Sequence, residues 1–297
     1  MYEECLLCPR DCGVNRNLHK GYCHVGSDLM VSRAALHMWE EPVISGKEGS
    51  GTVFFSGCNM GCVFCQNRAI SRGKAGRAIS AERLVEIFFE LKEKGANNIN
   101  LVTADHFIPS VRGAIVRAKN EGLKLPFLLN TSSYIKVDTL KSLEGLIDIY
   151  LPDMKYIRNE DSLKYSHAPH YVETAKEAID EMFRQQPECH FNDKNIIQKG
   201  VVVRHLLMPG MLIQAKMIVK YLHERYGANI YISLMNQYTP DMEYLQKEYP
   251  EICRKVTEYE YKSLIDYAAD IGVVNGFMQV GETAEESFIP EFDLTGV

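Results

Sequence analysis

The segment TVFFSGCNMGCVFCQN, residues 52–67, places closely spaced cysteines directly after a short apolar run. The apolar run is typical of a buried strand, and Cys58, Cys62 and Cys65 follow it with CxxxCxxC spacing. Three thiolates suit a [4Fe-4S] cluster and leave one iron open to a substrate or cofactor. A structural zinc ion prefers a fourth ligand, which the segment lacks. We therefore expect an iron-sulfur site at the end of this strand.

From residue 51 onward, short β-branched runs alternate with longer helical patterns, which is typical of repeated βα units around a parallel sheet. We expect strands at residues 52–56, 99–103, 127–130, 148–151, 201–206 and 229–234. We expect helices at residues 81–94, between a Ser80 N-cap and Gly95, and at 109–121, 171–185, 211–226 and 254–270. Six units are too few for a closed eight-stranded barrel, so the sequence predicts an α/β fold, a partial (β/α)6 TIM-like barrel over residues 51–297.

Composition narrows the functional classes. The 297 residues are 46% hydrophobic and 24% charged, which is ordinary globular usage. The net charge of -6 makes nucleic acid an unlikely partner. The apolar stretches are too short for a membrane helix and the N-terminus does not resemble a signal peptide, so we expect a cytoplasmic protein with no membrane contact. In such a chain cysteines more often serve metals or catalysis than disulfides, although Cys189 and Cys253 are expected to be ordinary thiols.

A second group of cysteines lies near the N-terminus. Its spacing is CxxCx3Cx10C, formed by Cys5, Cys8, Cys12 and Cys23. Four thiolates suit either a structural zinc ion, which would pin the segment over the barrel, or a second [4Fe-4S] cluster, which would relay electrons or hold a substrate. Residues 1–50 are thus expected to be a small cysteine-rich metal-binding segment, with residues 24–50 acting as a linker to the first strand.

The cysteine motif resembles that of the radical S-adenosylmethionine (SAM) superfamily, in which CxxxCxφC carries an aromatic residue at φ. The phrases NLVTADHFIP, LLNTSSY, IDIYLPDMKY and KGVVVRHLLMPG, which begin at residues 100, 128, 147 and 199, resemble the pyruvate formate-lyase activating enzyme-like branch. The resemblance implies that the open iron chelates SAM and that its reductive cleavage gives a 5′-deoxyadenosyl radical. It also implies that Phe64 lies near the adenine.

The resemblance further assigns roles after the later strands. Many superfamily members have a Gly-Gly-Glu stretch where this chain has Thr103, Ala104, Asp105 and His106. Asp105 is expected to accept the methionyl ammonium group or, with His106, to act as a catalytic acid or base. Thr103 and Asn130 are expected to contact the cofactor.

Two further stretches match activating enzymes. Asp153 and Lys155 match an Asp-Leu-Lys-type stretch that lies near the cofactor after the fourth strand. Arg204 matches an arginine that reaches the methionyl carboxylate, for which a planar fork of donors is well suited. Strand side chains alternate, so His205 is expected to face the other way.

The function implied is hydrogen abstraction by a SAM-derived radical, with glycyl radical enzyme activation as the finer expectation. The partners implied are SAM, an electron donor such as flavodoxin or ferredoxin, and a protein or peptide substrate. Two alternatives stay open at this point. One is radical modification of a peptide, small molecule or RNA, and the other is a non-catalytic iron-sulfur redox or carrier protein.

Overall fold

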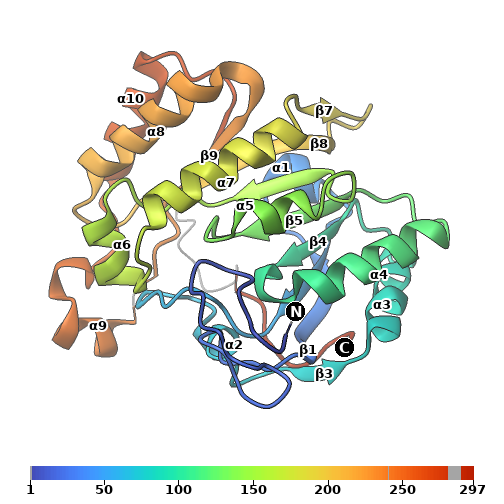
Figure 1. Ribbon diagram of the computed structural model, residues 1–297. Helices are drawn as coiled ribbons and strands as arrows, with labels where there is room; N and C mark the ends of the chain where they lie inside the picture. Colours follow the sequence, from blue (N-terminus) through green and yellow to red (C-terminus); the bar gives the residue numbers. More distant parts are fainter. Residues whose placement is uncertain (1, 240, 280–288) are drawn as a thin grey trace.

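A computed structural model describes residues 2–239, 241–279 and 289–297. Its strands form one sheet in the order β10-β9-β8-β6-β5-β4-β2-β1-β3, a linear path rather than a ring (Figure 1). The path contains β2 (Ser50–Phe55), β4 (Ile99–Val102), β5 (Phe127–Thr131), β6 (Ile149–Pro152), β8 (Ile197–Leu206) and β9 (Tyr231–Met235), each parallel to the next. These are the six predicted strands, so the open α/β barrel is confirmed.

The remaining strands extend this sheet. They are β1 (Leu29–His37), β3 (Arg77–Ile79), β7 (His190–Phe191) and β10 (Gly276–Met278). Strand β1 is antiparallel to β2 and β3, and β10 continues the parallel order beside β9. The α-helices are α1 (Pro42–Ser45), α2 (Arg68–Ser71), α3 (Ala81–Glu93), α4 (Ile108–Asn120), α5 (Val137–Lys141), α6 (Asn159–Ser166), α7 (Tyr171–Gln185), α8 (Leu212–Tyr226), α9 (Met242–Glu248) and α10 (Glu258–Asp270).

Local sequence explains where two of the helices begin. Ser80 caps α3 by accepting a hydrogen bond from the Arg83 backbone N–H at 3.1 Å, as predicted. Helix α10 begins at Glu258 rather than at residue 254, because Thr257 and Glu260 form a capping box. Arg254 lies before that box, and its side chain forms an ion pair with Glu260.

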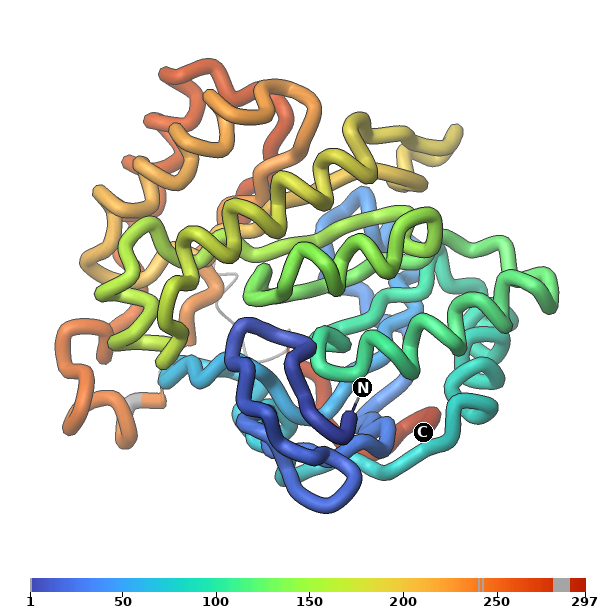
Figure 2. The backbone as a smooth tube through the Cα atoms, in the orientation of Figure 1, coloured from blue at the N-terminus to red at the C-terminus, as the bar shows by residue number. Residues whose placement is uncertain are grey.

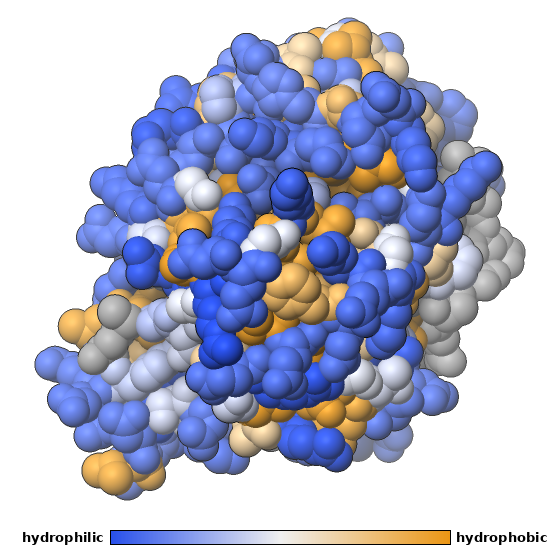
Figure 3. Space-filling model, turned by 90° about the vertical axis from the view of Figure 1, so that its right-hand side faces the viewer, coloured by the Kyte–Doolittle hydropathy of each residue, from blue (hydrophilic) through white to orange (hydrophobic). Residues whose placement is uncertain are grey.

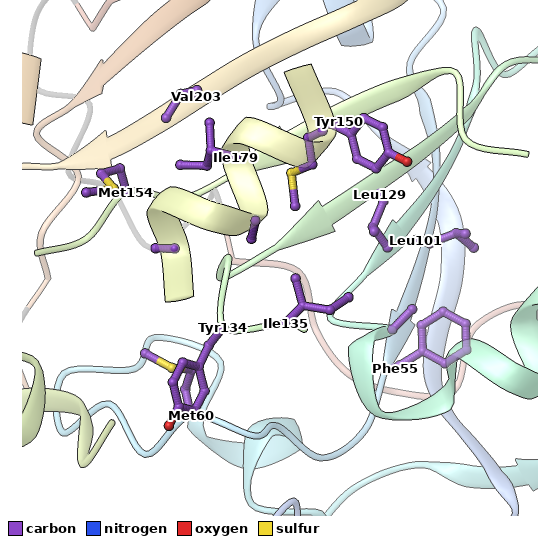
Figure 4. Packing of buried hydrophobic residues seen from close by; sticks show 14 of the residues in the cluster. Phe55, Met60, Leu101, Leu129, Tyr134, Ile135, Tyr150, Met154, Ile179 and Val203 are labelled. Atoms are coloured by element: carbon purple, nitrogen blue, oxygen red, sulfur yellow. The ribbon is translucent and has the colours of Figure 1, made fainter. Parts of the chain in front are cut away.

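The main core fills the space between the sheet and the surrounding helices. Leu101 of β4, Leu129 of β5 and Val203 of β8 belong to this core, and Figure 4 shows Val203 beside Ile179 of α7. A smaller cluster, which includes Val43, Ile44 and Val202, packs on the other face of the sheet, inside the barrel. Because strand residues alternate between these two clusters, each strand end can present a side chain to the barrel interior.

The linker expected at residues 24–50 is in fact part of the sheet. It contains β1 and α1, and β1 pairs with β2 over most of its length. Residues 2–28, dark blue in Figure 2, form no helix or strand, and they contact the cysteine loop through a hydrogen bond from the Cys58 backbone N–H to the Cys23 carbonyl. The apparent linker therefore extends the sheet beyond β2.

None of the helices in the described part of the chain has the length and apolarity needed to cross a membrane. The side of the molecule drawn in Figure 3 is dominated by hydrophilic side chains, and apolar ones show mainly in the hollows between them.

Candidate active site at the open end of the barrel

A cavity of about 600 Å³ lies at the carboxyl ends of the parallel strands. This is the end where α/β barrels carry their chemistry, and the volume is ordinary for a cofactor or substrate site. The cavity wall brings together most of the predicted site residues: Cys58, Cys62, Cys65, Thr103, Asn130, Asp153, Lys155 and Arg204. Residues from four separate strand ends and the cysteine loop therefore share one space.

The cysteine triad, Cys58, Cys62 and Cys65, forms the part of this wall that follows β2. Ser166 donates a hydrogen bond to the Cys62 sulfur at 3.0 Å, and the Met60 backbone N–H lies 3.4 Å from the Cys58 sulfur. Burial and the neighbouring thiols raise the pKa of Cys58, and burial raises the pKa of Cys62. Thiols of this kind ionise when they bind a metal centre, and that binding releases protons.

The donor set of the triad, three thiolates on one loop, fits an iron-sulfur cluster better than a structural zinc ion, which prefers a fourth ligand. A cluster instead takes one thiolate at each iron, so its ligands need not converge on a point. Cys58, Cys62 and Cys65 would hold it against the cavity, with hydrogen bonds to sulfur already in place.

Asp153 and Lys155 form a buried ion pair on the same wall. The Lys155 Nζ lies 2.5 Å from the Asp153 Oδ2. Burial opposes the charge of Lys155, but the Asp153 carboxylate and the Cys62 thiol raise its pKa above the ordinary value. Tyr171, the first residue of α7, fixes the loop: its hydroxyl accepts the Lys155 backbone N–H at 3.0 Å and lies 2.9 Å from the Ser132 carbonyl, to which it can donate. The pair is thus held rigidly beside the triad.

Arg204 faces the barrel interior and carries a second ion-pair network. Its Nε and Nη2 donate to the Glu41 carboxylate at 2.8 and 2.6 Å, and Nη2 also binds Glu40. All three side chains are at most 13% exposed. His205 faces the other way, as the alternation predicted, and its Nδ1 lies 2.8 Å from the Met154 carbonyl. The guanidinium expected to meet a cofactor carboxylate therefore already binds two carboxylates of the protein.

Asp105 and His106 lie behind the cavity wall, in a 3-10 turn after β4. Thr131 donates to the Asp105 carboxylate at 2.5 Å, and burial raises the pKa of Asp105 to about 6. The His106 Nε2 lies 2.9 Å from the Ser56 carbonyl, and burial lowers the pKa of His106 to about 3. Thr103, which precedes them, lines the cavity at φ +58°, a strained conformation for a β-branched residue and one that is common at functional sites.

Phe64 also lies off the cavity wall. It is 8% exposed, and its ring packs at 5.8 Å from the ring of Tyr238. The neighbouring Gln66 does line the cavity, and its amide donates to the Gln237 carbonyl at 2.6 Å. The aromatic position of the motif therefore anchors the cysteine loop to the segment after β9.

The four N-terminal cysteines lie close together beneath this loop. Cys5, Cys8 and Cys23 are buried, and Cys12 is half-buried. Burial and then the neighbours Cys23 and Cys5 raise the pKa of Cys8 to about 11. The structure thus gathers the predicted quartet, and it places the quartet against the triad rather than at a distance from it.

Several site residues carried no signal in the sequence. Glu40 and Glu41 bind Arg204, Ser166 binds Cys62, and Tyr171 supports the Asp153–Lys155 pair. Each lies outside the motif that it serves, so local spacing cannot reveal it. Glu40 and Glu41 lie in residues 24–50, which the sequence indicated only as a linker.

Comparison with known proteins places this geometry in a family. The family model described as the Radical SAM superfamily matches residues 52–222. The uncharacterized protein MJ0674 of Methanocaldococcus jannaschii is 29% identical over 279 residues, which cover 90% of this chain and 75% of its own.

Two solved structures are similar to this chain at low sequence identity. HydG, a maturase of the [FeFe]-hydrogenase, matches 78% of this chain and 52% of its own with a TM-score of 0.50 and 14% identity. Streptococcus suis SuiB bound to S-adenosylmethionine matches 76% of this chain and 49% of its own with a TM-score of 0.48 and 13% identity. This chain thus spans about half the length of those two chains. The HydG likeness concerns the fold alone, whereas the family model covers more than half of this chain, including β2 and the cysteine triad. The chain belongs to the Radical SAM superfamily.

Proposed function

We propose that the protein cleaves SAM reductively at a [4Fe-4S] cluster held by Cys58, Cys62 and Cys65, and abstracts hydrogen from a polypeptide substrate. Superfamily membership implies the iron-sulfur cluster and SAM, and when bound they supply one-electron cleavage of a carbon–sulfur bond. The observation that carries the proposal is the shared cavity, because the triad and the Asp153–Lys155 pair stand on one wall of it. The electron donor we expect is of the flavodoxin or ferredoxin class.

The chain's own side chains suit this cofactor. SAM presents an ammonium group, a carboxylate and a sulfonium. Asp153 offers a carboxylate for the cationic groups and Lys155 an ammonium for the carboxylate, next to the triad. Thr103 and Asn130 add polar groups on the neighbouring strand ends. A non-catalytic redox or carrier protein would have no use for this polar chamber, so the geometry favours an enzyme.

The mouth of the cavity favours a polypeptide. Met38, Trp39 and Met278 all line it and are 42%, 56% and 58% exposed. An exposed apolar rim of this kind is typical of a surface that receives side chains of a partner. Glu40 and Glu41 on the floor repel phosphate groups, which disfavours RNA. Activation of a glycyl radical enzyme is the finer proposal, and it rests on the sequence resemblance.

The decisive experiment is anaerobic reconstitution with iron and sulfide, followed by reduction with SAM and assay of 5′-deoxyadenosine and methionine. Both products are expected from the unaltered protein. Cys62→Ala should abolish them, because the triad then has too few thiolates, and the matched control Cys189→Ala should not. Full SAM cleavage by Cys62→Ala would refute the assignment.

The substrate proposal has its own test. Peptides that carry glycine dideuterated at Cα are added to the reconstituted enzyme, and deuterium in 5′-deoxyadenosine is measured by mass spectrometry. Transfer of deuterium supports abstraction from glycine. Steady SAM cleavage with no deuterium transfer from any glycine peptide would refute the glycyl radical proposal and leave SAM cleavage standing.

A further inference from the structure

The N-terminal segment is unusually long for one without regular structure. Residues 2–28 form no helix or strand, yet Cys5, Cys8 and Cys23 are at most 9% exposed. Loops longer than about 15 residues without secondary structure are uncommon and are usually functional. A segment of this kind has few apolar side chains to bury, so a bound metal group would supply the missing stabilisation.

A buried cation points to what the quartet of Cys5, Cys8, Cys12 and Cys23 would hold. Arg16 is 2% exposed, and its guanidinium donates to the carbonyls of Gly26 and His106 at 2.5 Å each. Its Nη1 lies 3.9 Å from the Cys5 sulfur, and within the described residues no carboxylate pairs with it. Burying an unpaired charge is costly. An anionic group bound by the four thiolates would pair with this guanidinium.

The quartet touches the triad directly. The Cys58 backbone N–H donates to the Cys23 carbonyl at 3.3 Å. Gly57 makes this approach feasible: its φ is +86°, and a Cβ there would lie 2.5 Å from the Cys23 carbonyl oxygen. Asn59, inside the triad loop, is buried, and its backbone carbonyl accepts a hydrogen bond at 2.8 Å from Arg10, which lies between Cys8 and Cys12 in the sequence. Two groups bound at these sites would thus be near neighbours.

We propose that the quartet binds a second [4Fe-4S] cluster, which accepts one electron from a reduced donor of the ferredoxin or flavodoxin class and passes it to the cluster of the triad. The inference rests on the proposed function, because the electron is destined for SAM cleavage. The donor is oxidised by one electron, the quartet cluster is reduced and then reoxidised, and the triad cluster is reduced. No bond within the protein is made or broken.

The contact with the triad favours a cluster over zinc, because a zinc ion has no redox chemistry and cannot pass an electron. The contact between Cys23 and Cys58 places the quartet where a redox group can serve the triad, and Arg16 would stabilise the extra negative charge of its reduced form.

The test uses the full chain, reconstituted anaerobically, in three forms: unaltered, Cys5→Ser with Cys8→Ser, and Cys58→Ala with Cys62→Ala. Iron and zinc are counted, and reduced samples are examined by electron paramagnetic resonance with and without SAM. We expect about eight irons in the unaltered protein and about four in each variant. The variant that lacks Cys5 and Cys8 should keep a resonance signal that SAM alters. The variant that lacks Cys58 and Cys62 should keep a signal that SAM does not alter.

Proximity gives a second readout. In the fully reduced unaltered protein, the two paramagnetic clusters should show spin–spin broadening that is absent from both variants. Arg16→Met should lower the reduction potential of the signal that SAM does not alter, and leave iron content unchanged. Zinc with about four irons, or two clusters without broadening, would overturn the inference while leaving the proposed function intact. Loss of the SAM-sensitive signal from the unaltered protein would instead refute the proposed function.

Discussion

Replacing Arg204 with Met tests whether this arginine stabilises the folded protein or binds the carboxylate of the cofactor. The side chain binds Glu41 through two nitrogens and also binds Glu40, with every partner at most 13% exposed. Arg204→Met keeps the apolar bulk and leaves two buried carboxylates without their cation. Removing one partner of a buried ion pair costs about 3–5 kcal/mol, and we expect a loss in the free energy of unfolding of that size at pH 8.

The loss should depend on pH with a defined sign. In the unaltered protein burial raises the pKa of Glu41, but the Arg204 guanidinium offsets this and holds it below 4.5. The ion pair then contributes stability above that pH, which is lost as pH falls through the lowered pKa. In Arg204→Met the guanidinium is gone, and burial, the largest influence on Glu41, acts against only the hydrogen bonds from Ser233 and the backbone. We therefore expect its pKa to rise above 4.5 and stability to fall as pH increases. The difference in free energy of unfolding between the two proteins should grow from pH 4.5 upward, by about 1.4 kcal/mol per pH unit for each proton involved.

The assay is anaerobic urea denaturation at several pH values, together with a SAM titration of the reduced cluster. Arg225→Met is the matched control, because Arg225 pairs with Asp180 at 3.0 Å on the surface, where both are more than a third exposed, and should cost less than about 1 kcal/mol. An Arg204→Met protein with unchanged stability at pH 8 and a SAM affinity reduced about 10- to 100-fold would refute this reasoning. That pattern would show that Arg204 binds the cofactor carboxylate.

Three further substitutions probe the frame of the site. Tyr171→Phe removes the acceptor of the Lys155 backbone N–H, so we expect a loss of about 1–3 kcal/mol in urea denaturation; no change would show that water replaces the hydroxyl. Gly57→Ala places a Cβ against the Cys23 carbonyl at a positive φ, so it should cost at least about 1–2 kcal/mol, and a fully stable variant would contradict the close packing. Burial raises the pKa of Asp105 from 3.8 to about 6, so the free energy of unfolding should fall by about 3 kcal/mol as pH rises between those values. Asp105→Asn should abolish this pH dependence. An identical pH dependence in the variant would assign it to another group.

The sequence alone predicted the features that depend on patterns among neighbouring residues. Buried parallel strands appear as short apolar runs, and this pattern predicted all six strands of the partial barrel. The alternation of side chains along β8 predicted that Arg204 and His205 face opposite ways, and it holds because Val202 and Val203 pack into different clusters. Strand β1 was missed because it is antiparallel and its alternation of buried and half-buried positions is broken at residues 31 and 32, where its register with β2 shifts.

The partners of Arg204 depend on that missed strand. The end of β1 and the short helix α1 carry Glu40 and Glu41 to the cavity floor, more than 160 residues before the arginine in sequence. No spacing rule relates positions so far apart, and only the sheet order brings β1 and β8 to the same chamber. The consequence is chemical: a SAM carboxylate that approached Arg204 would have to displace a glutamate, whereas Lys155 pairs with a single carboxylate, that of Asp153. We therefore propose that Lys155 receives the cofactor carboxylate and that Arg204 keeps Glu40 and Glu41 folded beneath it.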